Sequence, residues 1–162
     1  ALKRGLLEND TREKLISLMA DLNKTASETM QNYPVNACTD VSGFGLLGHL
    51  LEMARASKVE VNLFSDKVPV IKNVKKFVTA NIIPGGTLNN LDYVSEFVEW
   101  PDNFSESNKI ILADAQTSGG LLISVPQAYT NKLVNELKTK GVHDASVIGE
   151  VINKKKGKII VY

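Results

Sequence analysis

The sequence has little of the chemistry on which disulfide-rich and zinc-binding proteins depend. Its 162 residues include one cysteine, Cys38, so an internal disulfide and a cysteine cluster around a metal are excluded. A single cysteine agrees with a reducing compartment, and we expect a cytoplasmic location. The two histidines, His49 and His143, have no second ligand at suitable spacing. We therefore expect structural or surface roles for them and no zinc site.

Excess charge and long apolar runs are also absent. The 19 basic and 18 acidic side chains leave a formal net charge of +1, which disfavours a nucleic acid partner. The longest apolar stretches, residues 44–51 and 120–125, are shorter than the roughly 20 residues that cross a bilayer, so we expect no membrane partner. Residues 1–7 lack the features of a signal peptide, and position 1 is not methionine. We expect the chain to be a piece of a longer protein.

What is present is typical of a folded domain. Hydrophobic residues make up 43% of the sequence and charged residues 23%, close to globular averages. A chain of this length fits one domain of roughly 100–200 residues, so we expect residues 1–162 to form a single domain. Helical and strand patterns alternate along it. This alternation predicts an α/β (α+β) fold, a layered sandwich of a mixed β-sheet with helices.

Local patterns predict the order of the elements. Residues 10–13 have the pattern of a capping box, and one helix with an apolar stripe is expected from there to just before Pro34. A second helix, apolar on most faces and therefore central, is expected from the glycines at 43–45 to about Ser57. The other predictions are strands over 35–41, 59–64 and 121–125, helices over 70–80 and 91–100, a helix from Pro126 to near Gly141, and a hairpin of 147–152 with 159–162 across a lysine-rich turn at 154–158.

The first candidate site is Cys-Thr-Asp-Val-Ser-Gly-Phe-Gly at residues 38–45, where a strand is expected to end and a helix to begin. Asp40 can hold a divalent cation, while Gly43 and Gly45 let the backbone approach a ligand at a helix N-terminus. These features suit metal-bound phosphates. The alternative is that Asp40 or Ser42 caps the helix and that the glycines allow tight packing.

Two further segments combine glycines with small polar residues. In the stretch 114–120, the hydroxyls of Thr117 and Ser118 precede Gly119 and Gly120 and can form an anion-binding concavity. The same residue types also make ordinary turns. The stretch Pro-Gly-Gly-Thr at 84–87, with Asn90 close behind, by itself indicates no more than a loop.

Taken in order, these segments resemble those of the selenide, water dikinases, also called selenophosphate synthetases. The resemblance rests on residues 39–50, 84–87 with Asn90, 114–122 and 148–151. It covers nearly the whole chain, but it corresponds only to the C-terminal domain of these enzymes, which aminoimidazole ribonucleotide synthetase and its relatives share. Ser42 stands where many members have threonine, and Ala115 where many have proline.

The resemblance implies a transferase reaction in which ATP, selenide and water give selenophosphate, AMP and orthophosphate, with Mg2+ bound to the nucleotide. It implies that Asp40 is a magnesium ligand and that no catalytic residue lies in this chain. The nucleophile would belong to an N-terminal domain, the expected partner, and Cys38 is not that nucleophile. The intact enzyme would be a homodimer, and this chain alone would be inactive. The nucleotide-binding residues that the resemblance implies are Gly43, Gly45, Thr117, Ser118, Gly119 and Gly120.

Two alternatives stay open at this point. One keeps the fold and changes the substrate, as in aminoimidazole ribonucleotide synthetase, thiamine-phosphate kinase or a hydrogenase-maturation relative. The other is a non-catalytic binding module on the same scaffold. The segments at 84–87 and 116–120 favour the selenide, water dikinases, whereas Asp40 argues only weakly against a binding module because it could serve as a cap.

Overall fold

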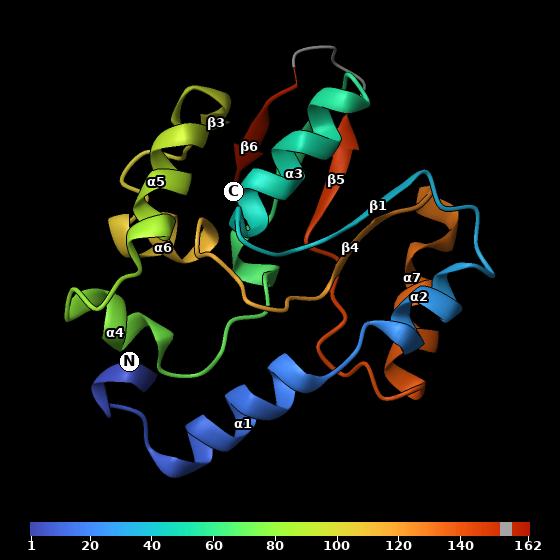
Figure 1. Cartoon of the computed structure of the whole chain (residues 1–162). Helices are drawn as coiled ribbons and strands as arrows, with labels where there is room; N and C mark the ends of the chain where they lie inside the picture. Colours follow the sequence, from blue (N-terminus) through green and yellow to red (C-terminus); the bar gives the residue numbers. More distant parts are fainter. Residues whose placement is uncertain (153–156) are drawn as a thin grey trace.

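The structure of the chain, a computed structural model, describes residues 1–152 and 157–162 (Figure 1). The elements, in chain order, are a 3-10 helix η1 (Leu2–Arg4), helices α1 (Asn9–Ala20) and α2 (Lys24–Met30), strand β1 (Ala37–Asp40), helix α3 (Gly45–Ala56), strand β2 (Glu60–Leu63), 3-10 helix η2 (Ser65–Lys67), helices α4 (Val74–Thr79) and α5 (Gly85–Val94), 3-10 helix η3 (Ser95–Phe97), strand β3 (Val98–Glu99), helix α6 (Glu106–Leu112), strand β4 (Leu121–Ser124), helix α7 (Gln127–Thr139), and strands β5 (Gly149–Ile152) and β6 (Ile159–Val161).

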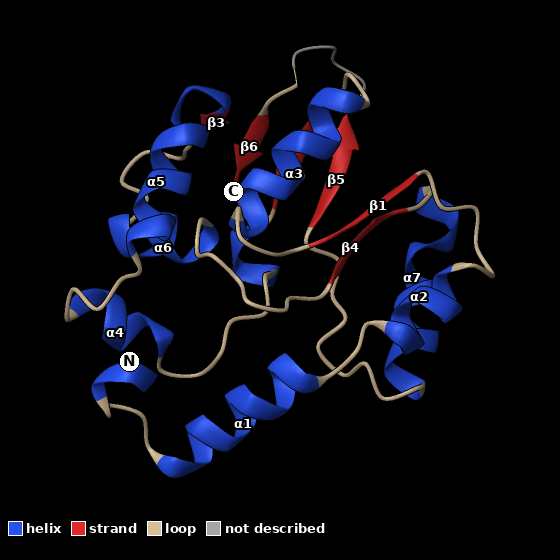
Figure 2. Cartoon of the chain, viewed as in Figure 1, coloured by secondary structure: helices blue, strands red, loops and turns tan. Residues whose placement is uncertain are grey.

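A four-stranded mixed sheet carries most of the fold, with strand order β3-β6-β2-β5. Strand β2 is antiparallel to β5 and parallel to β6, and β6 is parallel to β3. Helix α3 lies against this sheet, as Figure 2 shows, with α5 and α6 beside it. The fold class expected from the sequence, a mixed sheet layered with helices, is confirmed.

The main core forms between α3 and the sheet. Leu47 and Leu51 of α3 are fully buried, together with Leu63 of β2 and Ile159 of β6. Val94, at the end of α5, closes the same core from the side. Burial of apolar side chains on this scale is the main favourable term in folding. The prediction that α3 is the central helix is therefore confirmed.

Strands β1 and β4 form a separate antiparallel ribbon, with Ala37 opposite Ser124 and Asp40 opposite Leu121. In Figure 1 the ribbon runs from α2 and α7 to the start of α3. Helices α2 and α7 pack together over a small second core that contains Ala26, Leu133 and Leu137. The ribbon thus delivers the end of β1 and the start of β4 to the same place beside α3.

The predicted hairpin of residues 147–152 with 159–162 is wrong. Strands β5 and β6 do not pair with each other, because β2 lies between them and hydrogen bonds to both. Glu60, Val61 and Leu63 of β2 are buried, and a buried strand needs partners along both edges to satisfy its backbone groups. The lysine-rich turn predicted at 154–158 lies mostly outside the described residues.

The N-terminal prediction is also wrong in part. Two helices, α1 and α2, replace the single one expected, and α1 begins after Glu8 without any side-chain cap, so there is no capping box. No residue of α1 is buried. Leu18 is 43% exposed and Leu22, in the break between the helices, is 77% exposed. Leu15 and Met19 are half-buried, so the described part of the chain covers the apolar stripe of this helix only in part.

The region between residues 70 and 100 differs from its prediction as well. Helix α4 occupies only part of 70–80, and α5 begins at Gly85, directly after Pro84 in an extended conformation. The helix expected over 91–100 is right for 91–97, which lie in α5 and η3, and wrong beyond them, because Val98 is buried in strand β3 and pairs with Ile159. Tertiary pairing overrides the local helical pattern here. Among the described residues, no helix combines the length and the apolar character needed to cross a membrane.

Candidate functional site

The two glycine-containing segments singled out in the sequence meet at the end of the β1–β4 ribbon. The backbone N–H of Val41 donates to the carbonyl oxygen of Gly120 at 3.0 Å, and the N–H of Gly119 donates to the carbonyl oxygen of Val41 at 3.0 Å. The N–H of Gln116 donates to the carbonyl oxygen of Ser42, also at 3.0 Å. The loop that leads into α3 and the loop that leads into β4 are therefore one hydrogen-bonded unit.

The third segment fixes this unit from the side of α5. The hydroxyl of Thr87 donates to Oδ1 of Asp114 at 2.7 Å and accepts from the backbone N–H of Ala115 at 3.3 Å. The Asn90 amide donates to the carbonyl oxygens of Gly43 at 2.9 Å and of Ala113 at 3.2 Å. Thr87 and Asn90 are both buried. The segment 84–90 is thus a structural bridge between the other two, which the sequence by itself did not indicate.

Asp114 belongs to this bridge. Burial raises the pKa of its carboxyl group, and the hydrogen bond from Thr87 partly opposes that rise. The Gln116 side chain donates to the backbone carbonyl oxygen of Asp114 at 3.1 Å. Asp114 therefore holds neighbouring groups in place at a cost in desolvation.

The four glycines of the site have two different roles. Gly45 has a φ of +68°, and a Cβ there would lie 2.6 Å from the carbonyl oxygen of Ala113, so both conformation and space require glycine. A Cβ on Gly119 would meet the carbonyl oxygen of Val41. At Gly43 and Gly120 a Cβ would meet nothing within 4 Å. The packing alternative thus describes Gly45 and Gly119, whereas Gly43 and Gly120 leave open space beside the backbone.

Asp40 ends β1 with an exposed side chain. No hydrogen bond or ion pair of its carboxylate is found within the described ranges, and Thr117 and Ser118 of the facing loop are exposed too. The capping alternative is wrong, because the residue before α3 is Phe44 and no side chain caps that helix. The described residues contain no group of three or more histidine, cysteine, aspartate or glutamate side chains that could hold a metal ion, so they form no complete protein metal site around Asp40.

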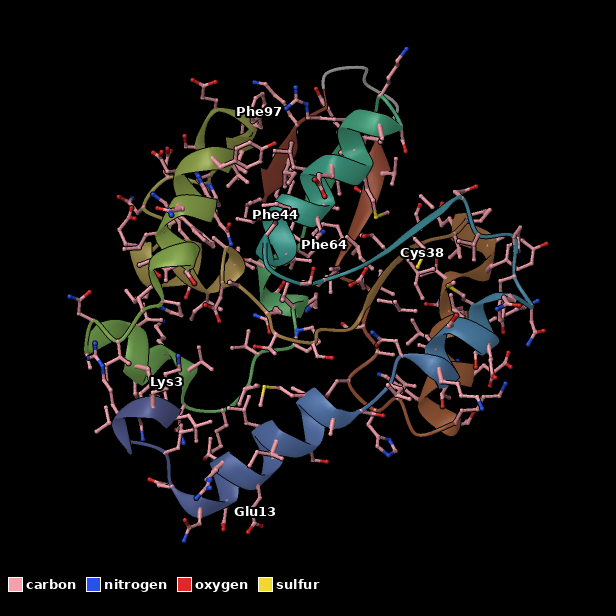
Figure 3. All side chains as sticks on the ribbon, in the orientation of Figure 1. Lys3, Glu13, Cys38, Phe44, Phe64 and Phe97 are labelled. Atoms are coloured by element: carbon pink, nitrogen blue, oxygen red, sulfur yellow. The ribbon has the colours of Figure 1, made fainter. Side chains whose placement is uncertain are left out.

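Cys38 and His49 lie close to these residues. Cys38 is half-buried on β1, where Figure 3 labels it, and burial followed by the charge of Asp40 raises the pKa of its thiol. A thiol with a raised pKa is a poor nucleophile, in line with the prediction for Cys38. His49 is buried on α3, and its ring lies 3.2 Å from the Ser42 hydroxyl and 3.4 Å from the Glu52 carboxylate.

Sequence reasoning missed one contact to the site from a distant part of the chain. The Asn23 side chain, just before α2, donates to the carbonyl oxygen of Gly119 at 2.9 Å. Asn23 stands in no motif, and its partner is 96 residues away. Local pattern carries no signal for such a contact.

The fold and these loops define a class: layered α/β domains in which glycine-containing loops meet beside a central helix. The chain belongs to the family described as AIR synthase related protein, C-terminal domain, which matches residues 1–162.

Relatives with known names share this domain. The chain is 43% identical over 154 residues to the selenide, water dikinase of Clostridioides difficile (strain 630), which covers 95% of the chain and 44% of that protein. It is 40% identical over 161 residues to the selenide, water dikinase of Aliarcobacter butzleri (strain RM4018), with 99% of the chain and 46% of that protein covered. The chain thus spans less than half the length of these relatives.

A solved structure has the same fold. The crystal structure of a HypE-HypF complex matches 89% of this chain and 38% of its own chain, with a TM-score of 0.63 and 19% sequence identity. At that identity the likeness shows the fold alone.

Proposed function

We propose that this chain is the C-terminal domain of a selenide, water dikinase, which makes selenophosphate, AMP and orthophosphate from ATP, selenide and water. The observation that carries the proposal is the hydrogen-bonded contact between the end of β1, with Asp40, and the loop 116–120. It joins two of the segments on which the resemblance rests, 39–50 and 114–122, and the side chains of Asp40, Thr117 and Ser118 are exposed beside it. The names of the relatives support the same reaction over the alternatives with other substrates.

In this proposal the chain binds part of the nucleotide's phosphates. The hydroxyls of Thr117 and Ser118 are exposed and can donate to phosphate oxygens. The open space at Gly43 and Gly120 allows the backbone to approach the same group. Gly45 and Gly119 act indirectly, because they allow the two loops to pack closely enough to form the site.

The chain can supply one of the several ligands that a magnesium ion needs, and that ligand is Asp40. Asp40 offers an exposed carboxylate without a protein partner in the described ranges, and oxygen ligands of this kind suit Mg2+. Magnesium, when bound, neutralises charge on the phosphates. The remaining ligands would come from the nucleotide and from an N-terminal domain. The role of this chain is to position the phosphates and supply one carboxylate, and it contributes no nucleophile or general base.

The same proposal includes the partners expected from the resemblance. An N-terminal domain completes the site, and the intact protein is a homodimer that uses ATP and selenide. The relatives' greater length supports a further domain. The cytoplasmic location expected from the single cysteine stays a prediction.

The experiment uses the full-length protein with ATP, Mg2+ and selenide, and follows AMP and selenophosphate by phosphorus NMR. We expect both products to form only when selenide is present. Turnover with thiamine phosphate in place of selenide would instead support the alternative with another substrate. Absence of any ATP consumption would support the binding module. The 162-residue chain alone should release no AMP, because it supplies only one charged group for a triphosphate.

A further inference from the structure

His49 is a buried polar side chain that the proposed function does not use. It lies on the first turns of α3 and is 8% exposed. A buried imidazole needs partners for both ring nitrogens, because an unsatisfied buried polar group costs free energy. Both partners are present. Nε2 lies 3.2 Å from the Ser42 hydroxyl oxygen, and Nδ1 lies 3.4 Å from a carboxylate oxygen of Glu52.

His49 thus contacts both Ser42 and Glu52. Glu52, one turn along α3 and 57% exposed at its side chain, has a carboxylate oxygen 3.4 Å from Nδ1, which forms an ion pair when the ring is protonated. With a proton on Nε2, the ring donates to the Ser42 hydroxyl oxygen, and the hydroxyl proton stays available to donate to a phosphate oxygen. The Phe44 ring lies beside the imidazole at a centroid distance of 5.6 Å. Figure 3 labels Phe44 at the start of α3.

Ser42 is fixed by hydrogen bonds at both its carbonyl oxygen and its hydroxyl group. Its carbonyl oxygen accepts from the N–H groups of Gly45 and Gln116, both at 3.0 Å, and its hydroxyl is bound to His49. Ser42 lies two residues after Asp40 in the loop proposed to meet the phosphates. A hydroxyl that is already fixed loses no rotational freedom when a ligand binds, so its orientation adds to affinity.

We propose that His49 is a positioning residue that, oriented by Glu52, holds the Ser42 hydroxyl in place for the phosphates of a bound nucleotide. This inference rests on the proposed function. His49 does not touch the ligand. It acts through Ser42, so the two residues should be energetically coupled in nucleotide binding.

The test measures binding of the β,γ-imido analogue of ATP, with Mg2+, to the full-length protein by calorimetry. His49→Leu keeps roughly the size of the side chain and removes the hydrogen bond with Ser42 and the contact with Glu52. We expect it to raise Kd about three- to tenfold, the effect of one net hydrogen bond. His49→Gln can still reach Ser42 and should restore most of the affinity, and Ser42→Thr, which keeps the hydroxyl, should bind normally. His143→Leu, the same change at an exposed position, is the matched control and should leave Kd unchanged.

A double-mutant cycle separates positioning from a structural role. Ser42→Ala should weaken binding, and adding His49→Leu to it should change Kd by less than about twofold, since the two act as a unit. Additive losses, or a His49→Gln protein as weak as His49→Leu, would overturn the inference. Should His49→Leu fail to fold, Glu52→Gln and His49→Gln replace it in the comparison. We expect Glu52→Gln to weaken nucleotide binding modestly and His49→Gln to bind nearly normally. Weaker binding by His49→Gln than by Glu52→Gln would contradict the inference.

The two proposals fail in different ways. If the unsubstituted protein binds no magnesium nucleotide, the proposed function is wrong and this inference falls with it. If the unsubstituted protein binds the analogue and His49→Leu binds it equally well, the positioning role alone is wrong.

Discussion

The carbonyl oxygen of Val41 occupies the space that a side chain on Gly119 would need, and it accepts a 3.0 Å hydrogen bond from the Gly119 N–H. Gly119 is therefore required for the close approach of two loops. Neither Gly119 nor Gly120 has a φ in the left-handed region, so the requirement for glycine at position 119 is one of space. The left-handed residue of the site is Gly45.

We predict that Gly119→Ala destabilises the protein by about 1–3 kcal/mol, because the added Cβ forces the two loops apart. Gly120→Ala is the matched control, since its Cβ meets nothing within 4 Å, and it should change stability by less than about 0.5 kcal/mol. Urea unfolding of both variants measures the difference. Equal stability of the two variants would show that the contact between Gly119 and Val41 is not required.

Asp40→Asn should lower selenophosphate formation by the full-length enzyme by about a hundredfold or more, on the scale of losing one major electrostatic contact. The melting temperature should stay nearly unchanged, because the carboxylate is exposed and caps no helix. Steady-state kinetics over a range of magnesium concentrations, beside thermal unfolding, checks both parts. Normal activity at saturating magnesium would remove Asp40 from the metal site.

Asp114→Asn should make the protein more stable than the unsubstituted protein at neutral pH. Burial raises the pKa of Asp114 in the folded state, so the folded state favours the protonated carboxyl. The stabilisation from that proton is complete below the unfolded pKa and is lost as pH rises through the folded pKa. Asparagine has no such loss and can still accept from Thr87. The advantage of the variant in urea unfolding should therefore shrink toward acidic pH, and a constant difference across pH would contradict this account.

Replacing two leucines from the predicted apolar helical faces with alanine should change stability by very different amounts. Leu51→Ala, at a fully buried position of α3, should cost about 2–5 kcal/mol of stability through lost burial and the resulting cavity. Leu22→Ala, at a position 77% exposed, should change the stability of the chain by less than about 0.5 kcal/mol. Thermal unfolding of the 162-residue chain tests both. A large loss at Leu22 would show that the N-terminal stripe is covered there after all.

The sequence alone determined the features that depend on local pattern. The run of apolar residues around Leu47 and Leu51 predicted the central helix, because a helix that is apolar on most faces must be largely buried. Strands β1, β2 and β4 were predicted from local residue patterns to within a few residues of their bounds. The two glycine-containing segments were recognised as candidate sites from residue type and spacing, and the structure brings them together.

Only the tertiary structure decided which segments are neighbours. Strand partners depend on which edges remain to be satisfied, so β2 separates β5 from β6 although the sequence predicts a hairpin. The bridge from Thr87 to Asp114 and from Asn90 to Gly43, and the contact of His49 with Ser42, depend on buried donors finding acceptors across the fold. Such pairings are set by packing and by the need to satisfy buried polar groups, and neither can be read from residues adjacent in the chain.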